Sequence, residues 1–152
     1  METAKERIFS ILKESGVEFE LFEHEPVFTC EQAAKVRGVR AEDGIKCLLL
    51  NADGKIILAL TRGDKRLDLE KITLLEGAER IRLAKDREIE KVALCKKGCV
   101  HPFCSVKTYV DCALAEKEWI EFNPGCHDKT IRIKVKDLLG LLEDSVVEKI
   151  SP

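Results

Sequence analysis

The chain has 152 residues, of which 45% are apolar and 36% are charged, and its formal net charge is −2 at pH 7. This length and composition predict one globular domain spanning residues 1–152, with a hydrophobic core of its own, and they exclude an intrinsically disordered chain. The small negative charge excludes a general attraction to polyanions, so any contact with nucleic acid has to come from a local patch of basic residues.

The first elements are a helix and a strand. Apolar residues recur at helical spacing within residues 2–15, and Gly16 is a typical C-terminal stop for that helix. Alternation with glutamates then predicts a strand over residues 17–24. The side chains expected on its inner face are Val17, Phe19 and Leu21.

A short helix and a hairpin follow. Thr29, with Gln32 three residues later, forms a capping box that predicts a helix ending near Gly38. Two apolar runs within residues 45–60 are joined by an Asp-Gly turn at positions 53–54, the typical signal of a β-hairpin. The runs are almost continuously apolar, so we expect this hairpin to be covered on both faces.

The second half of the chain predicts a mixture of helices and short strands. Helices are expected at residues 66–75, 84–94 and 135–143, and strands at residues 80–84, 106–111, 118–123, 129–133 and 145–150. Helices and strands alternate, but hairpins are frequent. The fold class is therefore α+β or α/β, with a mixed, largely antiparallel β-sheet or partial barrel and helices packed around it.

No segment is typical of a membrane or secreted protein. The longest apolar runs, residues 48–50 and 56–60, are far shorter than the roughly 20 residues of a membrane span. No apolar signal segment follows Met1. Seven cysteines without such a signal indicate a reducing compartment in which thiols stay free. We expect a cytoplasmic protein without membrane contact.

Lys46 is the most unusual charged residue, because it begins the predicted interior strand "IKCLLL". A buried ammonium is unfavourable unless it faces a cleft or an anionic partner. Alternatively, Lys46 lies just outside the strand and extends to solvent. The residue types alone leave both interpretations open.

The cysteines and histidines cluster in the second half of the chain. The set comprises Cys95, Cys99, His101, Cys104, Cys112, Cys126 and His127. The set contains no Cys-x-x-Cys pair, so its spacing is a weak signal for structural zinc and for a redox dithiol. A nucleophilic Cys104 or Cys126 activated by His101 or His127 is a further alternative, although no third, orienting group is evident. Cys30, Cys47 and Cys112 are typical of buried, inert thiols.

Two other segments have chemistry-bearing patterns. In "GCVHP" (residues 98–102), Gly98 allows a positive φ and Pro102 fixes the exit direction. Such a turn can direct backbone N–H groups at a substrate oxygen, or it can be an ordinary loop. The segment "RGDKR" has three cations at Arg62, Lys65 and Arg66, which fit either a solvated turn or a phosphate contact.

The order of these motifs resembles the YbaK/EbsC family, which comprises editing domains associated with prolyl-tRNA synthetase and their free-standing relatives. The similarity runs from about residue 10 to the C-terminus. It rests on the segments "HEPVFTCEQAAKVRGV", "GIKCLLL", "GDKRLDLEKI", "RIRLAKDREIEK", "GCVHPFC", "TYVDCAL" and "EFNPGCHDKTIRIKVKDLLGLL". Cys47 and Cys104 stand where the family has Thr and Gly.

The resemblance implies an aminoacyl-tRNA deacylase that hydrolyses the ester of a mischarged amino acid, typically Ala or Cys on tRNA(Pro). It implies no metal, no cofactor and no enzyme cysteine in the reaction. The partners implied are the aminoacyl-tRNA acceptor end and, as a protein, a prolyl-tRNA synthetase or another translation factor. The candidate catalytic residues are Lys46, Gly98, His101 and Pro102. The candidate substrate-binding residues are Phe28, Thr29, Cys47, Val100, Asp111, Gly125, His127, Arg62, Lys65 and Arg66.

Two other functions stay open at this point. A non-catalytic tRNA- or nucleotide-binding module would keep the pocket without turnover. A zinc-stabilised binding protein would lose its fold together with the metal.

Overall fold

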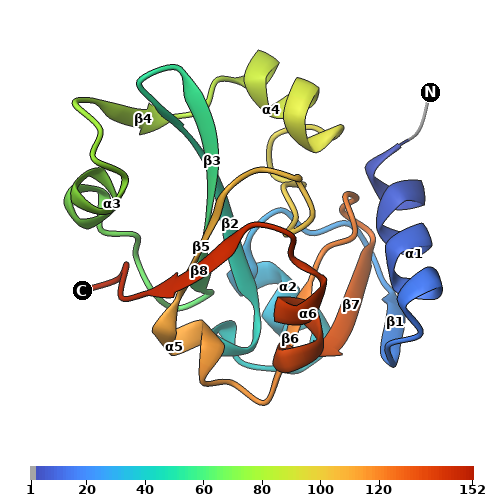
Figure 1. The fold of residues 1–152 in the computed structure, drawn as a ribbon. Helices are drawn as coiled ribbons and strands as arrows, with labels where there is room; N and C mark the ends of the chain where they lie inside the picture. The colour runs from blue at the N-terminus through green and yellow to red at the C-terminus, as the bar shows by residue number, and fades with distance from the viewer. Residues whose placement is uncertain (1–2) are drawn as a thin grey trace.

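The structure is a computed structural model that describes residues 3–152 (Figure 1). The helices are α1 (Ala4–Ser15), α2 (Cys30–Arg37), the 3-10 helix η1 (Ala41–Asp43), α3 (Leu69–Glu76), α4 (Asp86–Ala93), α5 (Cys112–Ala115) and α6 (Val135–Leu141). The strands are β1 (Phe19–Glu23), β2 (Ile45–Ala52), β3 (Lys55–Arg62), β4 (Ile81–Leu83), β5 (Thr108–Asp111), β6 (Trp119–Phe122), β7 (Lys129–Lys134) and β8 (Ser145–Glu148).

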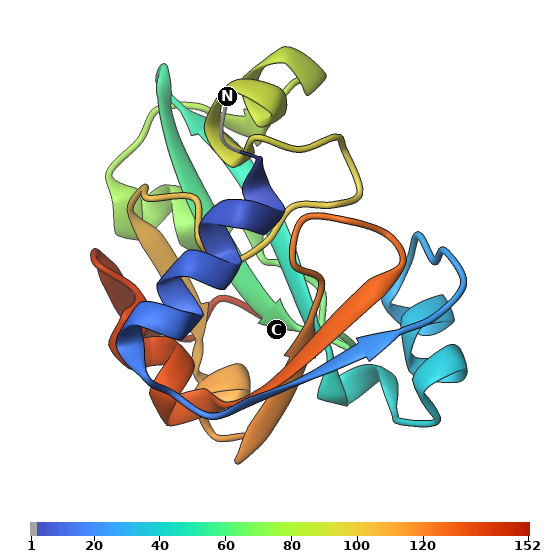
Figure 2. The same ribbon diagram turned by 90° about the vertical axis from the view of Figure 1, so that its right-hand side faces the viewer.

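The strands form two sheets. One is antiparallel, with the order β1-β7-β6, and Figure 2 shows β1 and β7 lying side by side. The other has the order β4-β2-β3-β5-β8, and β5 runs parallel to both β3 and β8 while the remaining pairs are antiparallel. Within residues 3–152 the sheets do not close into a barrel. The predicted α+β fold with a mixed, largely antiparallel sheet is confirmed.

The predicted caps and turns of the first half are confirmed. The left-handed Gly16 (φ 75°) ends α1, whose predicted start at residue 2 lies outside the described residues. The Thr29 hydroxyl accepts from the Gln32 N–H at 3.1 Å and begins α2. Asp53 (φ 51°) and Gly54 (φ 94°) make the tight turn between β2 and β3, as two-residue hairpins require.

Some predicted details are wrong. Leu21 of β1 is 42% exposed, and Phe22 is instead covered by the Arg37 guanidinium, 3.3 Å above its ring, because α2 packs there. The helix expected from residue 66 begins only at Leu69, since the Asp68 carboxylate caps the Lys71 N–H. The short helix α5 after β5 was not predicted.

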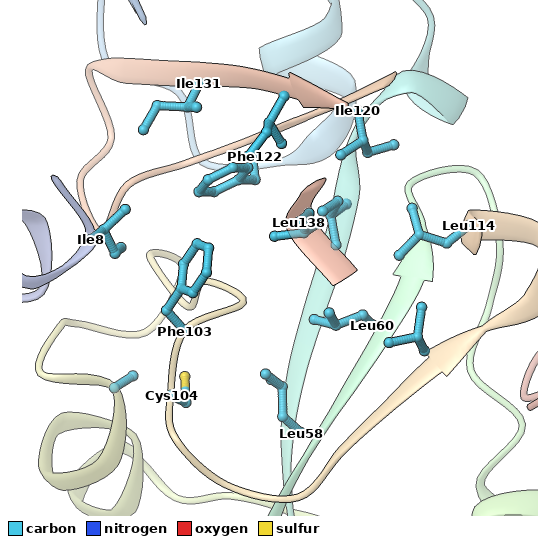
Figure 3. Close-up of a cluster of buried hydrophobic side chains, with 14 of the residues drawn as sticks. Ile8, Leu58, Leu60, Phe103, Cys104, Leu114, Ile120, Phe122, Ile131 and Leu138 are labelled. Atoms are coloured by element: carbon cyan, nitrogen blue, oxygen red, sulfur yellow. The ribbon is translucent and has the colours of Figure 1, made fainter. Parts of the chain in front are cut away.

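The main core lies between the two sheets and the helices α1, α5 and α6 (Figure 3). Its central side chains include Ile8, Leu58, Leu60, Leu114, Ile120, Phe122, Ile131 and Leu138. A second cluster on the opposite face of β2 and β3 contains Leu50, Ile57, Ile72, Tyr109 and Ile150. Both faces of the hairpin are therefore covered, as predicted.

The outer edge of β2 is paired only in part. β4 pairs with β2 from Leu50 to Ala52, and Ala84 N–H donates to Leu49 O at 2.9 Å. At the other end of β2, a single bridge joins Gly44 to Glu121 of β6. The middle of this edge lies between the two pairings, and there the fold places its pocket.

Candidate active site

The pocket has a volume of about 510 Å³ and three walls. One wall is the segment of residues 27–34, at the start of α2. The second is the edge of β2, residues 44–49, and the third combines the loop after α4 with the end of β6 and the start of β7. Segments far apart in the sequence thus enclose one concave site, of the size that holds a small ligand.

Lys46 lines this pocket at the N-terminal end of β2 and is half-buried. Its Nζ donates to the backbone oxygen of Lys65 at 3.2 Å. None of the ion pairs within residues 3–152 involves Lys46. The ammonium can therefore offer further N–H donors to a ligand, because an ammonium has three.

The loop of residues 98–102 divides into two sides. Gly98 and Val100 line the pocket, and Gly98 has a φ of 92°. A Cβ at Gly98 would lie 3.4 Å from Cε1 of His127, so both conformation and space favour glycine. The carbonyl of Val100 is held by the Asn123 side-chain amide at 3.0 Å. Asn123 was not predicted, since its partner lies 23 positions away.

His101 faces the interior and does not line the pocket. The Phe103 N–H donates to its Nδ1 at 3.1 Å, so Nδ1 is unprotonated and Nε2 must donate to Ala93 O at 2.9 Å. Burial lowers the pKa of His101 to about 4, and the Ala93 contact offsets only part of this effect. The imidazole is therefore neutral near pH 7, and its two hydrogen bonds fix the loop on the side that faces the core. Pro102 is also buried and lies outside the pocket lining.

His127 connects the three walls. Its Nδ1 lies 3.1 Å from Val27 O, which can only accept, so Nδ1 carries the proton. Its Nε2 then accepts from the Cys99 thiol at 3.2 Å. The Phe28 ring, which is 62% exposed, packs against the imidazole at a tilt of 47°, with 4.4 Å between centroids. Both nitrogens are engaged, so His127 holds the walls together in this arrangement and offers no free base.

Three cysteine thiols in and near this loop are held in the protonated form by burial. Burial raises the pKa of Cys99 to about 11, and it raises the pKa of Cys95 and of Cys104 to about 12. Cys104 is 3% exposed and donates to His101 O. Because its thiol is held as a donor and His101 is fully bonded, the alternative of a Cys104–His101 nucleophile is wrong.

Two further alternatives also lack geometric support. Burial raises the pKa of the Cys126 thiol, and His127 contacts Cys99 in its place. Within residues 3–152, no three His, Cys, Asp or Glu side chains are grouped as metal ligands. The Cys99–His127 contact supplies two such groups, whereas structural zinc needs four.

A buried carboxylate positions α2 against β6. Glu121 is 5% exposed and lines the pocket. Arg37 of α2 reaches both of its oxygens at 3.0 and 3.1 Å, and Arg132 Nη2 lies 2.8 Å from Oε2. Such bidentate, charge-assisted contacts fix orientation as well as distance. They hold the helix that carries Thr29 and Cys30 at the pocket. Glu121 also had no local signal, since Arg37 is 84 positions away.

Five of the predicted substrate-binding residues line the pocket, namely Phe28, Thr29, Cys47, Val100 and His127, whereas Asp111, Gly125, Arg62, Lys65 and Arg66 lie outside its lining. Asp111 is fully buried and accepts from Ile150 N–H and from the Ser151 hydroxyl, both at 2.8 Å, so it anchors the C-terminus. Gly125 packs against α1, where a Cβ would lie 2.6 Å from the Cβ of Ala4.

The predicted basic segment lies beside Lys46. Arg62 is paired with Asp64 at 2.6 Å and lies 3.9 Å from Glu42. Arg66 is exposed, and Lys65 contacts Lys46 through its carbonyl. No helix within residues 3–152 is long and apolar enough to cross a membrane.

A pocket with a lysine at a strand end, facing a glycine-containing loop, defines a small-ligand enzyme site on an α+β fold. Residues 24–141 match the model of the aminoacyl-tRNA editing domain. The chain belongs to this family. It is a hydrolase of the aminoacyl-tRNA deacylase class.

Curated relatives agree with this family, and a solved structure shares the fold. The chain is 29% identical to the multifunctional Ser/Thr-tRNA deacylase ProXp-y of Escherichia coli (strain K12), over 93% of this chain and 90% of the relative. It is 25% identical to the prolyl-tRNA editing protein ProX of Acetoanaerobium sticklandii, over 89% of this chain and 88% of the relative. A crystal structure described as a candidate trans-editing enzyme for prolyl tRNA synthetase has the same fold, with a TM-score of 0.88 and 24% identity. The match covers 100% of this chain and 99% of that one.

Proposed function

We propose that the chain acts as a free-standing trans-editing deacylase that removes a small, mischarged amino acid from tRNA. The observation that carries this proposal is the meeting of Lys46, Cys47 and the Gly98–Val100 loop around one pocket. The sequence resemblance favours Ala or Cys on tRNA(Pro), while one relative is named for Ser- and Thr-tRNA. The common feature is a small side chain.

The residues have distinct roles in this proposal. Lys46 donates to the ester or to the 3′-terminal nucleotide and orients the substrate. The backbone N–H groups of Gly98 and Val100, the two residues of this loop that line the pocket, stabilise the negative charge that develops on the carbonyl oxygen when water attacks. An aminoacyl ester is already reactive, so positioning and polarisation supply much of the rate without a thiolate. His127 and Cys99 keep the loop and the Phe28 segment at a fixed separation.

A second, hydrolytic pocket makes physical sense for small amino acids. A binding site discriminates one methylene by only about 1–3 kcal/mol, so a synthetase misacylates its tRNA with smaller analogues. A second pocket, of about 510 Å³, removes the wrong amino acids if it admits the smaller aminoacyl groups and excludes the bulkier, correct one. The acceptor end would reach it past the half-buried Lys65 and the exposed Arg66, next to Lys46.

A deacylation panel tests the proposal. Purified protein is mixed with Ala-, Cys-, Ser-, Thr- and Pro-tRNA(Pro), and loss of the ester is followed. We expect hydrolysis of at least one small amino acid and none of Pro. Lys46→Ala should lower kcat/KM about 10- to 100-fold, as the loss of a charged hydrogen bond implies. Lys13→Ala is the matched control, because Lys13 is exposed on α1.

Two outcomes contradict the proposal in different ways. Binding of tRNA without hydrolysis of any ester favours a non-catalytic binding module. Full activity of Lys46→Ala refutes the role of that lysine.

A further inference from the structure

The unpaired part of the β2 edge is centred on Cys47. In an antiparallel pair, alternate residues direct both N–H and C=O to the same side. Leu49 O accepts from Ala84 N–H at 2.9 Å, and Ile45 O accepts from the Cys30 thiol at 3.7 Å. Both carbonyls therefore face away from β3. Cys47 lies between them in the same alternation, so its N–H and C=O also face outward, along the wall of the pocket.

The neighbouring strands stop short of Cys47 on both sides. The bridge to β6 is at Gly44, and the pairing with β4 begins at Leu50. No hydrogen bond within residues 3–152 reaches the outward backbone groups of Cys47. Backbone N–H and C=O groups are strong hydrogen-bonding groups that proteins rarely leave unpaired in a sheltered position. Among the outward-facing residues of this stretch, Ile45 and Leu49 each have a bonded carbonyl, whereas neither backbone group of Cys47 is bonded within residues 3–152.

We propose that the backbone of Cys47 binds the aminoacyl group of the substrate as a one-residue strand. The C=O of Cys47 accepts from the α-amino group, and its N–H donates to the ester carbonyl. An aminoacyl ester has the N–Cα–C=O order of a strand residue, so it can make the two bonds of a hydrogen-bonded antiparallel pair. This inference rests on the proposed function and adds the orientation of the substrate.

The orientation has two consequences. Residues directly opposite each other in a sheet place their side chains on the same face, with Cα atoms about 5.5 Å apart. The substrate side chain therefore lies beside the Cys47 side chain. The ester carbonyl keeps a second lone pair, so it can also accept from the loop that contains Gly98.

Substrates with and without the α-amino group test the proposal on the unmodified protein. Hydrolysis of alanyl- and seryl-tRNA is compared with that of lactyl- and glyceryl-tRNA, in which a hydroxyl replaces the amino group. Each rate is divided by the uncatalysed rate of the same ester, because the amino group itself makes the ester more labile. We expect normalised kcat/KM to fall about 10- to 100-fold for the hydroxy esters, as for the loss of a charged hydrogen bond.

Equal normalised rates would overturn the inference and leave the proposed function intact. Failure to hydrolyse any of these esters, or the other members of the deacylation panel, would instead refute the proposed function, and the inference with it.

A backbone exchange assigns the contact to Cys47. Cys47→Ala is compared with the same protein that contains lactic acid at position 47, introduced by in vitro translation, so that only the N–H is replaced by oxygen. We expect a further loss of about tenfold in kcat/KM. The same exchange on Glu70→Ala, in the first turn of α3, is the control, because first-turn N–H groups lack an intrahelical acceptor. Unchanged kcat/KM on exchange at position 47, with thermal unfolding confirming the fold, would overturn the N–H contact.

Discussion

The neutral, buried His101 makes the stability of the protein depend on pH in a defined window. The pKa of His101 is lowered by burial from 6.5 to about 4. Between pH 6.5 and pH 4, His101 is therefore protonated in the unfolded chain but still neutral in the folded chain. Stability is therefore fully present above about pH 6.5 and falls as the pH approaches 4. One pKa unit corresponds to about 1.4 kcal/mol, so the loss attributable to His101 is about 3 kcal/mol.

His101→Gln isolates this effect, because glutamine does not titrate and its amide can still donate to Ala93 O. We expect the variant to be less stable than the wild type at pH 7.5, since the acceptor for the Phe103 N–H is lost. We also expect its stability to fall less between pH 6.5 and 4. Urea unfolding at several pH values measures both. Parallel pH profiles for the two proteins would refute the reasoning, as would a His101 NMR titration near pH 6.5.

Two further predictions concern the walls of the pocket. Cys99→Ala removes the donor to His127 and should lower kcat/KM about 3- to 10-fold. Cys99→Ser should keep most of the activity, because a hydroxyl can also donate. Cys112→Ala on α5 is the control, and equal rates for the Ala and Ser variants at position 99 would contradict this role. Gly125→Ala should lower the free energy of unfolding in urea by about 2–3 kcal/mol, because Gly125 has a φ of 86° and a Cβ there would contact Ala4. Gly16→Ala, where a Cβ would meet open space, should lower it by only about 1 kcal/mol. Similar losses for the two variants would show that the contact with Ala4 relaxes.

The local structure of the first half of the chain could be predicted from sequence because its signals are local. Thr29 and Gln32 are three residues apart, and the Asp53–Gly54 turn needs only its own backbone. In the strand at residues 17–24, Val17 and Phe19 pack against the core as predicted, while Leu21 departs from the predicted alternation for a non-local reason. Arg37 of α2 covers Phe22, and nothing in the strand itself indicates that contact.

The candidate site was predictable in its strand residues and less so in its loops. Lys46 and Cys47 line the pocket, and alternation along a strand limits where their backbone groups point. In the loop of residues 98–102, by contrast, Gly98 faces the pocket while His101 faces the core. A loop has no repeating geometry that would indicate which side chains face inward. Asn123 and Glu121 were missed because their partners are distant in sequence.

The short gap in the β2 edge also bears on how the protein avoids aggregation. An open strand edge invites another polypeptide to add a strand, which is a common route to aggregation. Here β6 and β4 end the accessible edge on either side of Cys47. An incoming chain would need several consecutive free residues, while a single amino acid needs one. The two flanking pairings therefore shorten the part of this edge with which another polypeptide could pair.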